Sequence, residues 1–415
     1  MEIDGDRLRG DIETNATFGA TAADEGRGRT VLTGSDADRR AREHFVEQLE
    51  DGGLDVRVDA VGNIAGRWTP PECDPDAAPV AFGSHLDSVP HGGIFDGPLG
   101  TYGALEAVRA MQEAGAALHR PVEVVCFTEE EGARFGIGTL GSSVATGRLD
   151  AADALERTDD EGVTLGECLE GIGFDGDAEI EAAGWDAWAE LHIEQGTRLT
   201  AADAGVGLVE SITGITNCAV TIEGEADHAG ATPMDERSDA FAAAAEFVLG
   251  LERAAKERST ASEAAVATAG AASVEPNVRN IVPAAVRLDL DIRDTERAGM
   301  DELVERCERT LARLERTRGV DTTLERYRDS EPTQMAERCL TAASRAAETR
   351  GIDAVRLHSA AMHDTANVAA ATDAVLLFAP SEDGISHSPR EWTDWADCAA
   401  ATGVLGETVR SLASR

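Results

Sequence analysis

Lysine is almost missing from this chain: Lys256 is the only lysine among 37 basic residues. Aspartate and glutamate together number 78, so the formal net charge is −41 and the pI is about 4.4. Such a charge argues against nucleic acids and acidic membranes as partners. The acidic residues are spread along the chain, which we interpret as adaptation to a cytoplasm of high salt, where charges are screened over about 3 Å. An acidic enzyme from an ordinary cytoplasm is the plainer alternative.

Long apolar runs are missing as well. No window of about 18 apolar residues occurs, which argues against a membrane-spanning helix. The first residues, Met-Glu-Ile-Asp-Gly-Asp, lack the basic and apolar regions of a signal peptide, so we expect a cytoplasmic protein. The seven cysteines include no Cys-x-x-Cys pair, which favours reduced thiols over a disulfide framework. A Gly-x-Ser-x-Gly motif is also missing, which argues against a serine hydrolase of that type.

The length of 415 residues is too great for one ordinary core and sufficient for two domains. In 1–211 and 326–415, apolar strand patterns alternate with amphipathic helix patterns. This predicts an α/β fold with a mixed, mostly parallel sheet flanked by helices, and functional sites at the C-terminal ends of the strands. Between 212 and 325, further strand patterns and two long helix patterns predict a smaller, independent α/β domain.

A single segment carries the first candidate site. The apolar run Ala78–Phe82 predicts a buried strand, and His85 and Asp87 follow it two residues apart, so they project to one face of an extended chain. A histidine that binds a metal commonly donates its second ring proton to a carboxylate. A loop rich in glycine and proline then delivers Asp96. A polar turn with a surface histidine is the plainer explanation, but the three residues together favour a metal site.

Three further segments place candidate ligands after predicted strands. The buried-strand pattern Val122–Phe127 leads into Glu129–Glu131, where unpaired carboxylates would be costly unless they bind metal. His192 ends another strand pattern, and His387 lies in a turn near the C-terminus. Histidines and carboxylates at strand ends suit a hydrolytic centre with two metal ions, Zn²⁺ first, with Mn²⁺ and Co²⁺ as alternatives.

Four strings in this chain carry a family resemblance: Gly-Ser-His-Leu-Asp-Ser-Val-Pro…Gly-Gly-Ile-Phe-Asp-Gly, Glu-Glu-Gly-Ala-Arg-Phe, Leu-His-Ile-Glu-Gln-Gly and Ser-His-Ser-Pro-Arg-Glu. In this order they resemble the amidase/hydantoinase-carbamoylase branch of the dinuclear-zinc aminoacylase and carboxypeptidase superfamily. That branch includes N-carbamoyl-L-amino acid hydrolases, β-ureidopropionases and allantoate amidohydrolases. The resemblance implies a zinc-exopeptidase-like catalytic domain with an inserted lid and dimerisation domain. It also implies hydrolysis of an N-carbamoyl-L-amino acid to the amino acid, carbon dioxide and ammonia.

The resemblance further implies a role for each candidate residue. Five ligands would hold two divalent metal ions per subunit: His85 and His192 on one ion, Glu131 and His387 on the other, and Asp96 bridging both. Asp87 would orient His85, and Glu130 would be the general base that takes a proton from water and returns it to the leaving nitrogen. Substrate would be bound by a third set of residues: Gln195, His228, Asn280, Arg293 and His363.

Two of these substrate residues have specific expected contacts. His228 would reach the substrate carbonyl across a homodimer, and Arg293 would pair bidentately with the substrate carboxylate. A surface histidine, a solvated strand arginine and, for His363, a packing role are the plainer alternatives. Ala360 and Met362 stand where the family commonly has glycine, so the shape of the pocket and the size of the substrate stay open.

Several functions compete with the one implied. Allantoate, 3-ureidopropionate and N-acylated amino acids would fit the same centre, and the sequence does not fix which small anionic ureido or amido acid is preferred. A non-catalytic metal-binding or scaffolding protein on an inherited fold is a rival from another class. The presence of all ligands together with Glu130 and Arg293 argues against it.

Overall fold

The computed structural model describes residues 1–414 and divides into two compact units. Unit 1 combines Met1–Glu210 and Gln334–Leu357 with residues 362–414, and unit 2 combines Ser211–Thr333 with His358–Ala361. The predicted inserted domain spans 212–325. In the structure, the strand that begins at Asp321 continues to Ser330, and unit 2 includes it whole.

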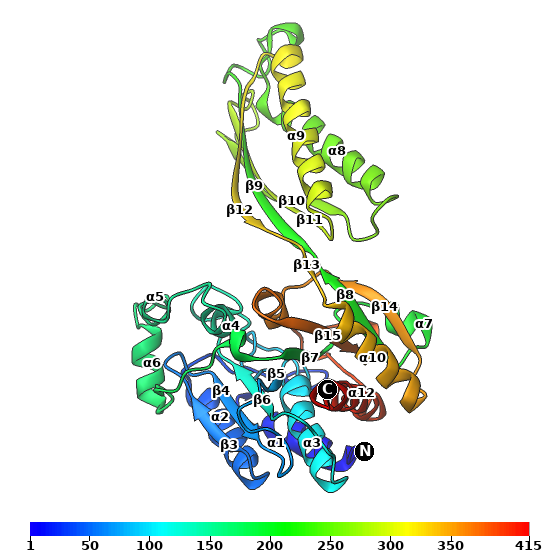
Figure 1. Cartoon of the computed structure of the whole chain (residues 1–415). Helices are drawn as coiled ribbons and strands as arrows, with labels where there is room; N and C mark the ends of the chain where they lie inside the picture. The colour runs from blue at the N-terminus through cyan, green and yellow to red at the C-terminus, as the bar shows by residue number, and fades with distance from the viewer. Residues whose placement is uncertain (415) are drawn as a thin grey trace. The chain divides into compact units, whose positions relative to one another are not determined.

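A nine-stranded sheet forms the centre of unit 1 (Figure 1). Its strands in spatial order are β13 (Thr333–Gln334), β8 (Val206–Ile212), β15 (Asp373–Ala379), β7 (Ala187–Ile193), β5 (Val80–His85), β6 (Val122–Phe127), β4 (Ile64–Trp68) and β3 (Asp55–Val58), with β14 (Ala354–Ser359) beside β8. The central strands β15, β7, β5 and β6 run parallel, while β8 and β4 pair with them in the antiparallel sense. The predicted mixed sheet with parallel central strands is confirmed.

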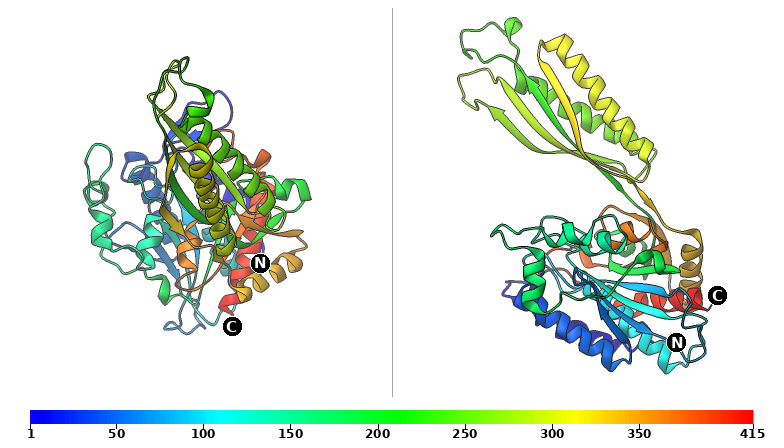
Figure 2. Two further views of the ribbon diagram at one scale, coloured as in Figure 1. Left: turned by 90° about the horizontal axis from the view of Figure 1, so that it is seen from above. Right: turned by 60° about the vertical axis from the view of Figure 1, so that its left-hand side comes forward.

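Helices cover both faces of this sheet (Figure 2). On one face, α3 (Pro98–Glu113) packs with α12 (Trp395–Ala413), and on the other α4 (Leu140–Ala145) packs with α11 (Asp364–Val368). β5, β6 and β7 are buried along their whole length, as expected for parallel strands between two helical layers. The other elements of unit 1 are α1 (Gly5–Asn15), β1 (Ala20–Thr21), β2 (Gly28–Arg29), α2 (Asp36–Asp51), α5 (Ala151–Leu155), α6 (Leu165–Ile172), α7 (Arg198–Ala202), α10 (Glu337–Arg350) and two 3₁₀ turns, Ala182–Gly184 and Glu382–Gly384.

The local sequence explains where several helices begin. Asp4 and Ser35 each accept backbone N–H groups at the starts of α1 and α2, so the first turns are capped. Thr164 and Glu167 form a reciprocal capping box at the start of α6. Pro98 occupies the first turn of α3, where the missing N–H has no helical partner to lose.

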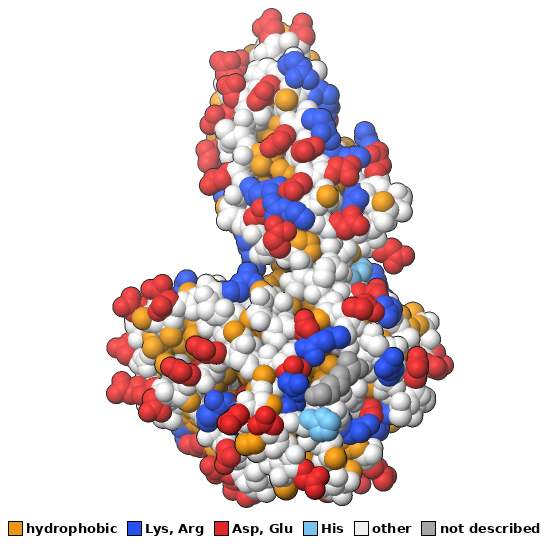
Figure 3. Space-filling model, in the orientation of Figure 1, with side chains coloured by type: hydrophobic (Ala, Val, Ile, Leu, Met, Phe, Trp, Pro, Cys, Tyr) orange, Lys and Arg blue, Asp and Glu red, His pale blue; other side chains and the backbone are white. Residues whose placement is uncertain are grey.

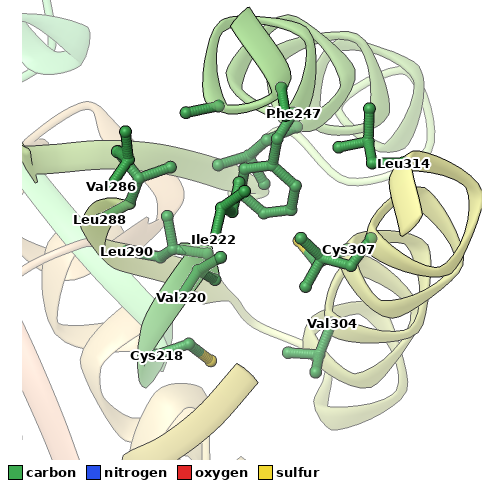
Figure 4. Packing of buried hydrophobic residues seen from close by; sticks show 14 of the residues in the cluster. Cys218, Val220, Ile222, Phe247, Val286, Leu288, Leu290, Val304, Cys307 and Leu314 are labelled. Carbon is green, nitrogen blue, oxygen red and sulfur yellow. The ribbon is translucent and has the colours of Figure 1, made fainter. Parts of the chain in front are cut away.

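Unit 2 is a four-stranded antiparallel sheet with two long helices on one face. Its strands in spatial order are β10 (Val266–Glu275), β11 (Ala285–Asp294), β9 (Gly214–Glu223) and β12 (Asp321–Ser330), and its helices are α8 (Ala240–Arg258), α9 (Arg297–Arg318) and a 3₁₀ turn, Met234–Glu236. Alternate strand residues such as Val220 and Leu288 pack with Phe247 of α8 (Figure 4). Full burial of one such side chain contributes about 2 kcal/mol to stability.

Unit 2 also exposes large apolar side chains. In residues 1–414, all six large apolar side chains that stand exposed belong to this unit: Met234, Phe241, Leu249, Val266, Val278 and Tyr327. Phe241 and Leu249 lie eight residues apart on α8 and therefore on one helix face. On the face of the molecule that Figure 3 shows, acidic and basic side chains lie interspersed.

Two expectations about the whole chain can be compared with the described residues. Over positions 1–414, every helix is too short or too polar to cross a bilayer. Across the same positions the cysteines form no disulfide, and all except Cys73 are buried.

Candidate metal centre

Three neighbouring strands of unit 1 bring candidate ligands to one edge of the sheet. β5 pairs in parallel with β7 as far as Gly83 and Glu190. Two residues further along each strand stand His85 and His192, whose rings stack with centroids 6.0 Å apart. On its other side, His85 pairs with Phe127, the last residue of β6, and the chain continues into Glu129–Glu131. The cluster therefore lies at the C-terminal ends of β7, β5 and β6, where open parallel sheets commonly carry their sites.

The first ligand cluster consists of His85, Asp96 and His192, all buried. Asp96 Oδ1 lies 3.5 Å from His85 Nε2 and 3.1 Å from His192 Nε2. One donor atom from each residue lies within 4.8 Å of the others, a spacing that could hold one ion. His85 Nε2 is buried and makes no hydrogen bond within the described chain. A buried nitrogen without a partner is costly, and an ion would take its lone pair.

The second cluster consists of Asp96, Glu131 and His387. His387 Nε2 lies 3.2 Å from Glu131 Oε2 and 3.6 Å from Asp96 Oδ2. Asp96 therefore turns one carboxylate oxygen to each cluster. The His387 side chain is 48% exposed, so the second cluster is accessible to solvent, whereas the first cluster is buried. His387 also has a φ of 55°, a strained conformation for a residue with a side chain, which its surroundings must hold.

The loop around Asp96 is shaped by the glycine that follows. Gly97 has a φ of 81°, and a side chain there would meet the His85 ring at 2.6 Å. Burial alone would raise the pKa of Asp96, but the His192 and His85 imidazoles hold it well below the usual value. The shared carboxylate is therefore ionised, as a metal ligand must be.

Asp87 connects the histidine to the glutamates. Its main-chain oxygen lies 3.2 Å from His85 Nδ1, and its Oδ1 lies 3.5 Å from the same nitrogen. Its carboxylate also accepts the backbone N–H groups of Glu130 at 3.2 Å and Glu131 at 3.0 Å. One side chain thus orients both an imidazole and the segment with the two acidic residues.

The three consecutive glutamates have three different environments. Glu129 is buried and accepts the backbone N–H groups of Arg134 and Phe135, so it closes the turn that follows. Glu131 faces His387, as above. Glu130 Oε2 lies 3.6 Å from His85 Nε2, and burial raises its pKa well above the usual value while His85 opposes that shift. The Glu130 carboxylate is therefore beside the first cluster but is a member of neither.

Gln195 and His363 also lie at this site. Gln195 Nε2 donates a hydrogen bond of 3.4 Å to Asp96 Oδ2. The ring of His363 is buried, 4.6 Å from the His192 ring and 5.5 Å from that of Phe378. Burial and the neighbouring His192 hold the pKa of His363 well below its usual value, so its ring is neutral. His363 therefore lies against the ring of a proposed metal ligand.

His228 and Asn280 lie in two paired loops of unit 2. The Asn280 carbonyl accepts the N–H of Ala229, and His228 Nδ1 accepts the N–H groups of Gly230 and Ala231 at 3.0 and 3.1 Å. The ring proton of neutral His228 is therefore on Nε2. Because the residue is exposed, this N–H is available to an external oxygen.

Arg293 lies on β11 of unit 2 and is held from two sides. Its Nε and Nη2 donate to the Asp291 carboxylate at 2.8 and 3.1 Å, and its Nη1 donates to the Ala360 carbonyl at 2.7 Å. A guanidinium has five N–H groups, so two of them remain for another acceptor. The carbonyl of Ala360, one of the residues that departs from the family pattern, thus helps to fix this arginine.

Within unit 2, Arg293 and His228 lie at opposite ends of the sheet. On β11, Arg293 pairs with Ile215 and Ala285 pairs with Glu223. Eight residues of strand separate these two positions, which is about 26 Å. Beyond Ala285 the two loops continue as a paired ribbon to Asn280 and His228. A small substrate cannot contact both ends of one chain's sheet.

Two buried charged residues of unit 1 were not anticipated from the sequence. Arg29 and Glu391 are 0% and 2% exposed and contact the loop that carries Asp96. Glu391 is the last residue of the string Ser-His-Ser-Pro-Arg-Glu, which also contains His387, so the sequence did indicate that Glu391 lies near the candidate site. Arg29 stands in no motif, so its contact could not be inferred.

Known proteins resemble this chain over nearly its whole length. An N-carbamoyl-L-amino acid amidohydrolase from Geobacillus stearothermophilus is 39% identical over 390 residues, covering 93% of this chain and 94% of its own. Allantoate amidohydrolase from Bacillus subtilis is 33% identical over 404 residues, covering 97% and 96%. The crystal structure of a hydantoinase/carbamoylase family amidase from Burkholderia ambifaria superimposes with a TM-score of 0.92 at 37% identity, covering 99% and 98%. The model of Peptidase family M20/M25/M40 matches residues 81–411, and this chain belongs to that family.

Proposed function

We propose that this chain is a dinuclear metal amidohydrolase that cleaves the carbamoyl C–N bond of N-carbamoyl-L-amino acids. The observation that carries the proposal is the Asp96 carboxylate shared by two ligand clusters, with the Glu130 carboxylate beside His85 of the first cluster. The activity named for the Geobacillus relative supplies the substrate class. The activity named for the Bacillus relative supports a second candidate, hydrolysis of allantoate by the same centre.

The residues present fit two divalent cations. Three imidazole nitrogens and two carboxylates are offered by His85, His192, His387, Asp96 and Glu131. This donor set suits Zn²⁺, with Mn²⁺ and Co²⁺ as alternatives. When bound, such ions would lower the pKa of the attacking water to about 7 and polarise the carbonyl oxygen.

Glu130 is assigned the proton transfers. Its carboxylate takes a proton from the water that attacks the carbamoyl carbon, while Asp87 holds its backbone N–H in place. The bond between that carbon and the amino nitrogen then breaks, and Glu130 returns the proton to the nitrogen. The released carbamic acid decomposes to carbon dioxide and ammonia.

Unit 2 is assigned the recognition of the substrate. The remaining N–H groups of Arg293 are assigned to the substrate carboxylate, and the Nε2–H of His228 is assigned to the carbonyl oxygen on which negative charge develops. Asn280 and Gln195 are assigned hydrogen bonds to the ureido group. Asp291 holds Arg293 in one orientation, which favours this geometry.

We also propose a homodimer formed through unit 2. His228 and Arg293 of one chain are too far apart to bind one small molecule, so a site that uses both needs His228 from a second copy. The six exposed apolar side chains of unit 2 support an interface there. The large acidic excess supports a high-salt cytoplasm as the working environment.

A panel of substrates tests the function. The purified protein, loaded in turn with Zn²⁺, Mn²⁺ and Co²⁺, is given N-carbamoyl-L-amino acids, their D-enantiomers, allantoate, 3-ureidopropionate and N-acetyl amino acids, and ammonia and free amino acid are measured. The proposal expects the highest kcat/KM on an N-carbamoyl-L-amino acid and little activity on its D-enantiomer. A higher kcat/KM on allantoate would select the second candidate, and no turnover of any member would overturn both.

A further inference from the structure

An N-terminal segment of unit 1 lies against both loops that carry candidate ligands. The N–H of Arg29 donates to the Gly92 carbonyl at 3.0 Å, and the N–H of Ser88 donates to the Val31 carbonyl at 2.9 Å. The N–H of Arg27 donates at 2.7 Å to the carbonyl of Pro389, two residues after His387. This segment precedes residues 81–411, the range that the family model matches.

The Arg29 side chain contacts the main chain of the loop that carries Asp96. It is completely buried, and its Nε donates to the Gly93 carbonyl at 3.2 Å. Its Nη2 donates to the carbonyl of Asp87 at 3.2 Å and to that of Asp96 at 3.5 Å. The guanidinium therefore connects the main chain at both ends of the loop.

Glu391 holds the same loop by its N–H groups. Glu391 Oε1 accepts the N–H of Phe95 at 2.8 Å and that of Asp96 at 3.0 Å. The fit is close, because a side chain at Gly93 would meet the Glu391 carboxyl group at 2.2 Å. Glu391 also follows His387 by four residues, so it ties the loop with the exposed ligand to the loop with the shared one.

We propose that Arg29 and Glu391 are a pair of positioning residues for the metal centre, which fix Asp96 between the two ligand clusters. Arg29 holds the carbonyl of Asp96 and Glu391 holds its N–H, so the peptide groups on both sides of this residue are fixed. Both side chains are buried against the same loop, where main-chain groups left without these hydrogen bonds would be costly. The inference rests on the proposed metal centre and assigns its alignment to residues that bind no metal themselves.

Metal affinity separates this role from a merely structural one. Outer partners of metal ligands typically change affinity by about 10-fold to 100-fold when they are replaced. For Arg29→Met and for Glu391→Gln, we expect the dissociation constant for Zn²⁺ to rise by about that factor, measured on apo-protein by competition with a chromophoric chelator. Glu391→Gln keeps the size and one acceptor oxygen, so it is the variant least disturbing to folding. Because both residues hold the peptide groups of Asp96, their effects are coupled, and the double variant is expected to lose less than the product of the two single losses.

A matched control is Arg109→Met. Arg109 is a partly buried arginine of unit 1 that donates to Asp11 and Gln48, which lie outside both ligand loops. This variant is expected to lower the melting temperature of the apo-protein and to keep wild-type Zn²⁺ affinity. Wild-type affinity in Arg29→Met and Glu391→Gln, with lowered apo-protein stability alone, would overturn the positioning role and leave the metal centre intact. A wild-type protein that binds no Zn²⁺ would overturn both.

Discussion

The two units of this chain present their candidate functional groups in opposite ways. In unit 1, His85, Asp96 and His192 are buried, and each is held by neighbouring side chains or main chain. In unit 2, His228 and Asn280 stand on exposed loops. The contrast separates two tasks: three of the five proposed ligands are buried and fixed within one folded unit, whereas two of the proposed substrate residues stand on exposed loops.

Burial explains why the first set can be arranged in advance. Asp87 fixes His85 together with the Glu130–Glu131 segment, and Asp96 is fixed through its own peptide groups. In unit 2, by contrast, the ring of His228 is held within residues 1–414 only by two backbone N–H groups, both of which donate to Nδ1. Side chains on exposed loops change conformation more easily than buried ones, which suits groups that close on a substrate after it binds.

The largest predicted effect concerns Glu130 in unit 1. Glu130→Gln removes the base but keeps the shape of the site, so we expect kcat to fall by about 10³-fold. The five ligands are unchanged, so the variant is expected to keep both metal ions, measured by elemental analysis of the dialysed protein. If metal is retained and turnover persists near the wild-type rate, the assigned role is wrong.

The next effect tests whether His228 acts across two chains. His228→Ala removes one donor to the developing oxyanion, which typically lowers kcat by about 10²-fold. Mixed with Glu130→Gln through a cycle of unfolding and refolding, it forms hybrid dimers in which one site has both residues. We expect recovery to about a quarter of wild-type activity, the statistical share of such sites in a randomly assorted dimer.

Two controls make this mixing experiment decisive. His119→Ala replaces an exposed histidine of unit 1 that has no assigned role, so it is expected to keep wild-type activity. Each inactive variant refolded alone is expected to stay inactive. Failure of the mixture to regain activity, when light scattering shows dimers, would place His228 and Glu130 of the same chain at one site.

A smaller effect is expected at Arg293. Lysine keeps the charge but cannot form the bidentate pair, so Arg293→Lys should raise KM by about 10-fold with a lesser effect on kcat. Arg287→Lys is the matched control, because Arg287 lies on the same strand and also pairs with the aspartate two residues away, Asp289. Equal KM values in the two variants would show that Arg293 does not bind the substrate carboxylate.

The parts of the molecule that the sequence predicts are those with local signals. The buried strands before His85, Glu129 and His192 have apolar runs, and the structure brings their ends together because adjacent parallel strands end at one edge. Strand β14, with the sequence Ala-Val-Arg-Leu-His-Ser, has no apolar run, and only its residues Leu357 and Ser359 are buried. This strand was therefore not predicted. Arg29 is the extreme case: its partners lie about sixty residues away, and nothing near it in the sequence indicates them.

The comparison of the units also predicts a difference in their response to salt. Unit 1 carries 54 acidic and 22 basic side chains and unit 2 carries 24 and 15, so self-repulsion is greater in unit 1. Between 0.1 M and 1 M KCl the screening length falls from about 10 Å to about 3 Å. We expect this to raise the free energy of unfolding of unit 1 by about 1 kcal/mol more than that of unit 2, the smallest of these effects.

Hydrogen exchange resolves the two units in one experiment. Peptides from β7 and α12 report on unit 1, and peptides from α8 and α9 report on unit 2. Sucrose at matched viscosity is the control, because it strengthens the burial of apolar surface without screening charge and should protect both units alike. If KCl protects the two sets of peptides equally, the acidic excess is not what makes this fold salt-dependent. If KCl protects the unit 1 peptides more and sucrose does not, repulsion among the acidic side chains is the cause.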